Sequence, residues 1–528
     1  MIALLLTLLV PAHAGDDPVL DAVVAEVERS AELRLPDNTP PHHVIARARS
    51  GWAGYANARM GALTWTSLSP VEDLAVEVRA GTPDFDSSGL GTRWLDTGFS
   101  RAGLPDVPTV RAVREVVWRE LDEQYKAAVE NLGRKTGAKD QLKLDDDREG
   151  NWQANIEPVT SITRRELIMP DVATLEAQVR ALSARMRSQG LQDGNVSISS
   201  WDGHYYVITS DGTRIVQPSR STTITMRVEI RADDDEVLGL TDVIAVADGD
   251  PMPSDAALAA RVDLLMATAQ AWAAAEPLDA PWYGPVLLEG EAAADFAEDS
   301  LSQEISGTPE PAEWQRWTQK ARPEPVDYAE PGTRLLPRGW TVTDDPQRSL
   351  GHACCLAFDA EGAPSQPVRV IEDGVVVAHL MSRTPNEHFS ETNGHARSTR
   401  DNNRSMARPS HVVVEPARAV SKAALWRTAR KQAKAQGLDR VLVVRDRSGL
   451  AFWRTLDGDE IPVRGFDSDE LDARAARGMT VAGPSSTHMM GQSTMYTVPD
   501  MLIANVAVVP DEPSPEPRTR RVSPLAGK

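Results

Sequence analysis

The chain has 528 residues, which is more than one hydrophobic core usually holds, so we expect two domains and short tails. Hydrophobic residues make up 41% and charged residues 25%, and the mean hydropathy is -0.34, a soluble globular composition that excludes broad disorder. The formal net charge of -21 repels phosphate backbones and argues against nucleic acid as a partner.

The N-terminus carries a short apolar run at residues 2–10, followed by Pro11 and the sequence Ala12-His13-Ala14. The run is too short to span a bilayer, and an A-x-A pattern is typical of signal-peptide cleavage. We therefore predict a secretory signal peptide over residues 1–14 and a mature protein that is periplasmic or secreted. No later stretch approaches the length of a membrane span, so none is predicted.

The first half predicts helices that alternate with strands. Apolar residues at steps of three and four predict helices near residues 20–33, 109–132, 172–186 and 256–272. Residues 62–67 and 73–81 predict two short strands separated by a Ser/Pro turn, and Ser210-Asp211-Gly212 predicts a hairpin. We place an N-terminal α/β domain at residues 15–275.

The second half is richer in strands. After a linker at residues 276–280, an apolar strand ends at Leu288, and a helix pattern continues toward Gly307. Further strands are predicted around residues 368–380, 411–416, 440–447 and 497–510, with a helix at residues 422–436. We place a C-terminal domain at residues 281–510 and a disordered tail at residues 511–528, and the fold class is α+β.

The only two cysteines, Cys354 and Cys355, are neighbours in the sequence. A disulfide between adjacent residues closes a strained ring, so we expect two buried or half-buried thiols. A thiol activated by His352 would suggest a cysteine peptidase. Adjacent residues of a strand point to opposite faces, however, which weighs against such a site.

Several segments of the second half occur in a recognisable order: GPVLLEGEAAADF at residues 284–296, FDAEGAP at 358–364, VRVIEDGVVVAHL at 368–380, ETNGHAR at 391–397 and the terminal strand at 499–509. In the first half, YYVITSDGTRI at residues 205–215 gives a weaker trace. In their order and spacing these segments resemble the TldD/PmbA family of metallopeptidase-related proteins.

The resemblance implies an N-terminal α/β domain followed by a strand-rich, barrel-like C-terminal domain. It also implies dimers that pass a peptide through a closed internal space. In the catalytic branch, an HExxxH motif at the strand-to-helix junction and a later Cys hold zinc, whereas a partner branch lacks those ligands. The implied partners are therefore a peptide or protein substrate and a second subunit, in a homodimer or in a heterodimer with a TldD-like subunit.

This chain departs from the family pattern at the zinc site. The first His of the motif falls on Glu289, its Glu on Gly290 and its second His on Ala294, while the later Cys falls on Thr487, next to His488. Zinc hydrolysis needs several donor side chains, an open position for water and a carboxylate base. Neither a glycine nor an alanine can supply these groups.

Two main interpretations follow. The leading one is a non-catalytic subunit or peptide-binding scaffold outside the cytoplasm, with no cofactor, that contacts peptides by strand addition along the C-terminal sheet. The alternative is an active metallopeptidase with an altered zinc site, in which Glu289 and His488 bind the metal and Glu291 is the catalytic base. Using Glu291 displaces the carboxylate by far more than catalysis usually tolerates. A purely structural envelope component is a third possibility.

A metal site rebuilt from other histidines is disfavoured. His388 and His395 lie seven residues apart, with Glu387 and Glu391 nearby, and would share one face of a continuous helix. The sequence Asn393-Gly394 breaks that helix. Single histidines in polar loops are also more often solvated or capping residues than metal ligands.

Overall fold

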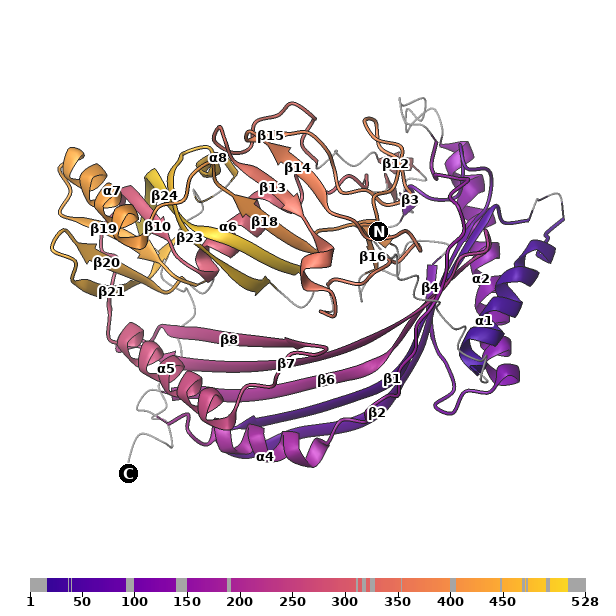
Figure 1. Cartoon of the computed structure of the whole chain (residues 1–528), viewed down its shortest axis with the longest axis horizontal. Helices are drawn as coiled ribbons and strands as arrows, with labels where there is room; N and C mark the ends of the chain where they lie inside the picture. Colours follow the sequence, from indigo (N-terminus) through magenta and orange to yellow (C-terminus); the bar gives the residue numbers. More distant parts are fainter. Residues whose placement is uncertain are drawn as a thin grey trace, which may run out of the picture.

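The computed structural model of the chain describes residues 17–36, 38, 40–91, 99–138, 150–187, 191–309, 312–315, 320–322, 328–352, 354–398, 405–446, 449–467, 471, 473–490 and 494–510. The predicted signal peptide and the predicted C-terminal tail lie outside these residues. The described fold is mixed α+β, as predicted, and its two large sheets lie next to each other (Figure 1).

Among the described residues, the first half builds a seven-stranded sheet in the order β4-β2-β1-β6-β7-β5, with β8 also paired to β7. Its pairs are antiparallel except that β5 runs parallel to β7. The sheet is strongly curved, and the second half of the chain lies on its concave side (Figure 1). The strands are β1 (His43–Arg59), β2 (Ala62–Arg79), β4 (Phe99–Gly103), β5 (Thr160–Ile162), β6 (Leu191–Thr209), β7 (Arg214–Arg231) and β8 (Val237–Ala247).

β2 is one long strand where the sequence predicts two short ones. It stays paired with β1 through the predicted turn, and Pro70 lies opposite Trp52. β4 pairs with β2 only from Asp73 to Glu77, so it leaves the edge of β2 near Pro70 uncovered. Proline has no amide proton to donate, but at such an edge this costs no hydrogen bond between strands. The prediction of a break was therefore wrong because pairing with β1 outweighs the local turn preference.

In the described residues, the main helices of the first half cover the convex face of this sheet (Figure 1). Each begins after a capping residue, Asp17, Thr109, Asp171 or Ser254, whose side-chain oxygen accepts an amide hydrogen bond from the first turn. None of the described helices has both the length and the hydropathy needed to cross a membrane. The elements are α1 (Pro18–Arg29), the 3-10 turn η1 (Ser30–Glu32), α2 (Val110–Gly137), α4 (Val172–Ser183) and α5 (Asp255–Ala273).

In the described residues, the second half builds a twelve-stranded sheet in the order β15-β14-β13-β18-β24-β10-β19-β20-β21-β9, with β22 and β23 also paired to β24. Its strands are β9 (Glu276–Pro277), β10 (Trp282–Leu288), β13 (Thr341–Asp344), β14 (Val368–Glu372), β15 (Val375–Val376), β18 (His411–Glu415), β19 (Arg440–Val444), β20 (Ala451–Thr455), β21 (Glu460–Arg464), β22 (Phe466–Asp467), β23 (Met479–Met490) and β24 (Thr494–Pro510).

Helices and two small sheets complete this half. The helical segments are α6 (Glu291–Leu301), η2 (Pro346–Ser349), α7 (Lys422–Ala435) and α8 (Ala473–Ala476). β16 (Ala396–Ser398) pairs with β17 (Ser405–Ala407). β11 (Ala312–Gln315) pairs with β12 (Lys320–Arg322) and with β3 (Leu90–Gly91) of the first half.

Polar contacts join the two halves. Arg464 pairs with Asp234 at 2.7 Å and with Glu236, and Trp272 Nε1 donates to the Val463 carbonyl at 3.1 Å. The predicted linker begins within β9, which pairs in parallel with β21 of the C-terminal sheet. The boundary between the domains stays a prediction, but the two halves clearly share a bonded interface.

Candidate functional site

The strand-to-helix junction indicated by the sequence lies inside the C-terminal sheet. β10 is apolar because it is an interior strand, parallel to β19 on one side and antiparallel to β24 on the other. Gly290 then turns the chain with φ of 60° and ψ of -121°, and α6 begins at Glu291. That backbone conformation strongly favours glycine. The predicted strand, turn and helix start are therefore confirmed.

Glu289 follows β10 directly, and its carboxylate forms an ion pair. Its Oε2 accepts a hydrogen bond from Arg445 Nε at 2.9 Å. Arg445 also donates to both carboxylate oxygens of Glu460, at 2.6 and 2.9 Å. Burial opposes the charged form of Arg445, but the hydrogen bonds with Glu460 and Glu289 outweigh it and raise the pKa of Arg445. A guanidinium group thus holds the carboxylate that could otherwise bind a metal.

His488 comes from β23 and lies against Gly290. A Cβ atom placed on Gly290 would lie 3.7 Å from His488 Cε1 and 3.8 Å from its Nε2. The Gly290 amide donates to Asp500 Oδ1 at 3.1 Å, which brings a further carboxylate to the junction. Burial raises the pKa of Asp500, although the Gly290 amide and the Lys422 ammonium partly oppose this shift. The fold therefore brings the junction together with the β23–β24 hairpin, which lies far from it in the sequence.

The imidazole of His488 has a hydroxyl partner. Its Nε2 lies 2.7 Å from Ser486 Oγ, two residues earlier on the same strand. Burial lowers the pKa of His488, and the Asp500 carboxylate partly opposes this shift, so the ring is neutral at pH 7. Thr487, at the position of the family Cys, shares a hydrogen bond of 2.7 Å with the Thr497 hydroxyl on β24.

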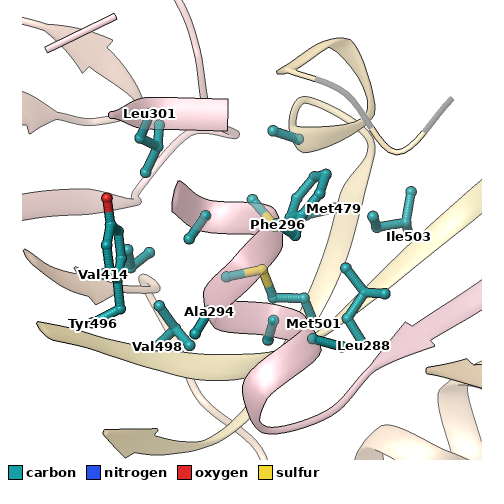
Figure 2. Packing of buried hydrophobic residues seen from close by; sticks show 14 of the residues in the cluster. Leu288, Ala294, Phe296, Leu301, Val414, Met479, Tyr496, Val498, Met501 and Ile503 are labelled. Atoms are coloured by element: carbon teal, nitrogen blue, oxygen red, sulfur yellow. The ribbon is translucent and has the colours of Figure 1, made fainter. Parts of the chain in front are cut away.

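The position of the second family histidine is part of the hydrophobic core. Ala294 is fully buried in the cluster that contains Leu288, Val498 and Met501. Figure 2 shows it on the face of α6 that packs against these side chains. Glu291 is the first residue of the helix, where the helix dipole favours a carboxylate.

The residues present do not fit the family's zinc centre. Such a centre needs three donors and an open position for water. Glu289 is bonded to Arg445, and Gly290 and Ala294 provide no donor. In the described part of the chain, three potential ligand atoms converge at one place only, which lies elsewhere. These atoms belong to Glu330, Glu387 and His388, and all three residues are exposed.

His388 and His395 contact different parts of the structure. His388 Nε2 is 2.6 Å from a Glu330 carboxylate oxygen at the surface. His395 is fully buried, and its Nε2 is 3.2 Å from Asp344 Oδ1. The two rings therefore satisfy separate local networks.

The expectation of two free thiols is wrong, because the structure joins Cys354 and Cys355 in a vicinal disulfide. Both residues are buried, as expected, and they pack with Met489 and Met495. They lie in a turn in which the Cys355 amide donates to the His352 carbonyl at 2.9 Å. The opposite-face argument applies to strands and does not hold in a turn.

Sequence reasoning missed Arg445, Asp500 and Ser486. Arg445 follows β19, which is parallel to β10, so the ends of the two strands meet at one edge of the sheet. Asp500 precedes Met501, which lies opposite Leu288 in the antiparallel pair of β24 and β10. Knowledge of these strand pairings would have revealed both residues, but the pairings are not visible in a single sequence.

Comparison with known proteins gives a consistent result. Residues 283–457 match the family model of the PmbA/TldA metallopeptidase C-terminal domain. No curated protein is similar to the chain at a significant level.

Three solved structures share the fold over nearly the whole chain. TldE from Thermococcus kodakarensis has a TM-score of 0.59 and 14% identity, and the match covers 93% of this chain and 100% of that one. A candidate modulator of a DNA gyrase from Thermotoga maritima has a TM-score of 0.59 and 12% identity, with 88% and 96% covered. One from Bacteroides thetaiotaomicron has a TM-score of 0.54 and 9% identity, with 92% and 98% covered.

At such low identities the likeness to these structures establishes the fold alone. The match of the C-terminal domain adds sequence similarity to it over the segment that contains the strand-to-helix junction. Together, the two findings show that residues 283–457 match the PmbA/TldA metallopeptidase C-terminal domain and that the chain shares its fold with the three solved structures.

Proposed function

We propose that the chain is a zinc-site-degenerate member of the TldD/PmbA family that acts as a non-catalytic subunit or peptide-binding scaffold outside the cytoplasm. The observation that carries this proposal is the ion pair between Glu289 and Arg445, at 2.9 Å. A fixed positive charge already neutralises the carboxylate at the position of the first family ligand. A divalent cation would have to displace that guanidinium group.

The helix α6 supports the same proposal. Gly290 replaces the catalytic carboxylate, and its backbone conformation disfavours any larger residue. Ala294 lies in the core, where an imidazole would be buried without a hydrogen-bond partner. Restoring the family site would therefore require several coupled changes.

Peptide contact is proposed to occur by strand addition at β23. In the described residues this 12-residue strand pairs with β24 alone, apart from one bridge between Ala482 and Ala419. The two ends of the main sheet, β9 and β15, have only two residues each. β23 thus offers the longer exposed edge, and strand addition needs only backbone hydrogen bonds.

The competing function is an active metallopeptidase with an altered site. One observation favours it: the neutral imidazole of His488 lies against the junction, close to Glu289 and Glu291 in the fold. In that case Glu289 and His488 would bind zinc, and Glu291 would act as the base. The exposed edge of β23 would then present the substrate.

Metal analysis and a cleavage assay separate the two functions. We expect the purified protein to hold much less than one zinc ion per chain. We also expect it to show no chelator-sensitive cleavage of casein. Stoichiometric zinc that is lost in Glu289→Ala, but kept in the control Glu372→Ala, would overturn the proposal. Glu372 is a suitable control because it is an exposed carboxylate, paired with Arg369 on the surface.

The partner and the compartment are proposed on the family resemblance and on the N-terminal sequence. We expect a homodimer or a complex with a TldD-like subunit, which co-purification with an HExxxH-bearing relative encoded nearby would test. Export is expected to leave the mature protein in the periplasm or the medium. Finding the full-length chain in the cytoplasmic fraction would contradict that location.

A further inference from the structure

A cavity of about 220 Å³ lies between the N-terminal sheet and the segment 354–360 of the second half. On the sheet side it is lined by residues of β1, β2, β4, β6 and β7. Opposite them, the Ala360 carbonyl accepts a hydrogen bond from Arg47 Nε at 2.6 Å, and Gln217 Nε2 donates to the Phe358 carbonyl at 3.1 Å. The cavity is therefore bounded by both halves of the chain.

Strand register places a cluster of charges on the cavity side of the sheet. Arg49 on β1 lies opposite Asp73 on β2 and Tyr205 on β6, and Arg101 on β4 lies opposite Ala75. Because side chains alternate between the two faces of a sheet, these positions share one face. All of them line the cavity.

Two of these arginines share one carboxylate. Arg49 Nε donates to Asp73 Oδ1 at 2.9 Å, and an Arg101 amino group donates to Asp73 Oδ2 at 2.6 Å. The Arg101 side chain is 36% exposed, whereas that of Asp73 is 19% exposed. Arg101 thus lies at the rim of the cavity with part of its guanidinium group open to a ligand.

Arg397 contributes a third guanidinium group from the second half. It donates to the Ser410 hydroxyl at 2.6 Å and to the carbonyls of Gly394 and Ala396, all of which are neutral acceptors. Its Nε is buried and has no hydrogen-bond partner among the described groups. Burial lowers the pKa of Arg397, and the charges of Asp359 and Asp344 oppose this shift only in part, so a bound anion would relieve the remaining cost.

The cavity has an excess of positive charge. Asp359, its second carboxylate, already accepts hydrogen bonds from the amides of Glu361, Ala363 and Ala396. Arg47 also lines the cavity, but it is paired with Glu77 at 2.8 Å. The other three guanidinium groups, of Arg49, Arg101 and Arg397, therefore face two carboxylates, in a chain whose formal net charge is -21. One uncompensated positive charge suits a monoanion, and the planar fork of arginine suits a carboxylate.

One wall of the cavity packs against strand β23. Met489 on β23 packs against the cluster of Cys354, Cys355 and Met495, and Cys354 lines the cavity. Leu356 and Phe358 supply apolar walls beyond Cys354. A peptide that follows β23 past His488 would therefore run toward the side of the cavity that Cys354 lines.

We propose that this cavity binds the C-terminal carboxylate of a peptide, with Arg101 and Arg397 as its contacts and the last side chain against Leu356 and Phe358. The inference rests on the proposed peptide-binding function and names the end of the peptide that is recognised. It makes no use of the zinc-site residues.

Binding of fluorescein-labelled Gly-Ala-Gly-Ala-Phe, with a free C-terminus or as the C-terminal amide, tests the proposal by anisotropy in the presence of a chelator. The acid is expected to bind at least roughly tenfold more tightly than the amide, because charge-assisted hydrogen bonds are lost in the amide. Arg397→Gln and Arg101→Gln should each remove most of that preference, and Arg369→Gln should keep it.

Equal binding of acid and amide would overturn the inference, as would unchanged preference in both cavity variants. Inorganic phosphate that competes as well as the unlabelled peptide acid would also overturn it, because the site would then be a general anion site. If Arg397→Gln fails to fold, the rim variant Arg101→Gln decides the question. Chelator-sensitive cleavage of casein would refute the proposed non-catalytic function. It would leave the inference about the cavity untouched, because peptide binding is measured without metal.

Discussion

Arg445 illustrates how one side chain can change the chemistry of a junction. It contacts two carboxylates, those of Glu289 and Glu460, and also lies over the Phe452 ring. Its side chain is 33% exposed, and those of Glu289 and Glu460 are 17% and 29% exposed, so water screens the pairs only in part. The guanidinium group therefore compensates charge that would otherwise favour a cation.

The variant Arg445→Gln is expected to lower the free energy of unfolding by about 1–2 kcal/mol, because it leaves two partly buried carboxylates without a cation. Urea unfolding at pH 7 measures the change. The control Arg369→Gln removes a pair whose members are both 58% exposed and should cost less than about 0.5 kcal/mol. Equal effects of the two substitutions would contradict a structural role for Arg445.

At the scale of single residues, the sequence was sufficient to identify what the junction lacks. Gly290 and Ala294 have no side-chain donor atoms in any fold, so their identity alone excludes the histidine and glutamate roles of the family motif at those positions. It could not identify what replaces the ligands, because Arg445 and Asp500 reach the junction only through strand pairing. The disulfide at Cys354 likewise depends on the turn that contains it.

Among the elements, β10 and α6 depend on the turn between them. Gly290 combines a φ of 60° with a ψ of -121°, and its amide donates to Asp500. A Cβ atom there would meet nothing closer than 3.7 Å. The requirement for glycine is therefore conformational rather than steric.

The variant Gly290→Ala is expected to lower the free energy of unfolding by about 1–3 kcal/mol through backbone strain, without a clash. The control Gly133→Ala, inside α2, should instead raise the free energy of unfolding by up to about 1 kcal/mol, because a Cβ there lies within 4 Å of no described atom and alanine favours a helix. Chemical denaturation of both variants gives the comparison. If Gly290→Ala leaves the free energy of unfolding unchanged, the junction tolerates ordinary residues. It would then also tolerate the glutamate that the family motif has at this position.

Helices were easier to predict than strands for a physical reason. α2 and α5 begin within one residue of the predicted starts, because their apolar periodicity and their caps, Thr109 and Ser254, are local features. β2 was predicted as two pieces because its continuity depends on β1, a partner that local patterns do not specify. The same limit applies to the order of strands in both sheets.

On the scale of the whole molecule, the two halves meet through buried charges. Arg383 of the second half donates to Asp211 at 2.8 Å and lies over the Trp152 ring. Glu77 of β2 accepts hydrogen bonds from Arg47 and Arg79, both at 2.8 Å. Apart from Asp211, whose side chain is 27% exposed, these groups are almost entirely buried, so a change in their ionisation is coupled to the docking of the halves.

Glu361 is the titratable group of this interface near neutral pH. Its carboxylate accepts hydrogen bonds from the Arg383 amide at 2.6 Å and from the Ser405 hydroxyl at 2.7 Å. Burial, followed by the charges of Asp359 and Glu77, raises its pKa from 4.5 to about 7. The folded protein therefore retains a proton on Glu361 that the unfolded chain releases near pH 4.5.

The unfolding free energy consequently contains a contribution that falls as the pH rises from about 4.5 to about 7 and then stays constant, because the folded state binds the extra proton. Glu361→Gln removes this titration. Its amide oxygen can accept from the Arg383 amide, while its amino group donates to Ser405, whose hydroxyl lies 3.5 Å from Glu77 Oε2. The variant should therefore fold with the same interface.

Between pH 5 and pH 8, we expect the stability of Glu361→Gln relative to the natural chain to increase by up to about 3 kcal/mol, the equivalent of the shift in pKa. Urea unfolding at a series of pH values measures this difference. Burial also raises the pKa of Glu72 to about 7, but this carboxyl group titrates in both proteins and cancels. The exposed control Glu372→Gln should show no such slope. If the stability difference between Glu361→Gln and the natural chain does not change with pH, Glu361 is already ionised at pH 5. The arginines around Glu77 would then compensate the charges of both Glu77 and Glu361.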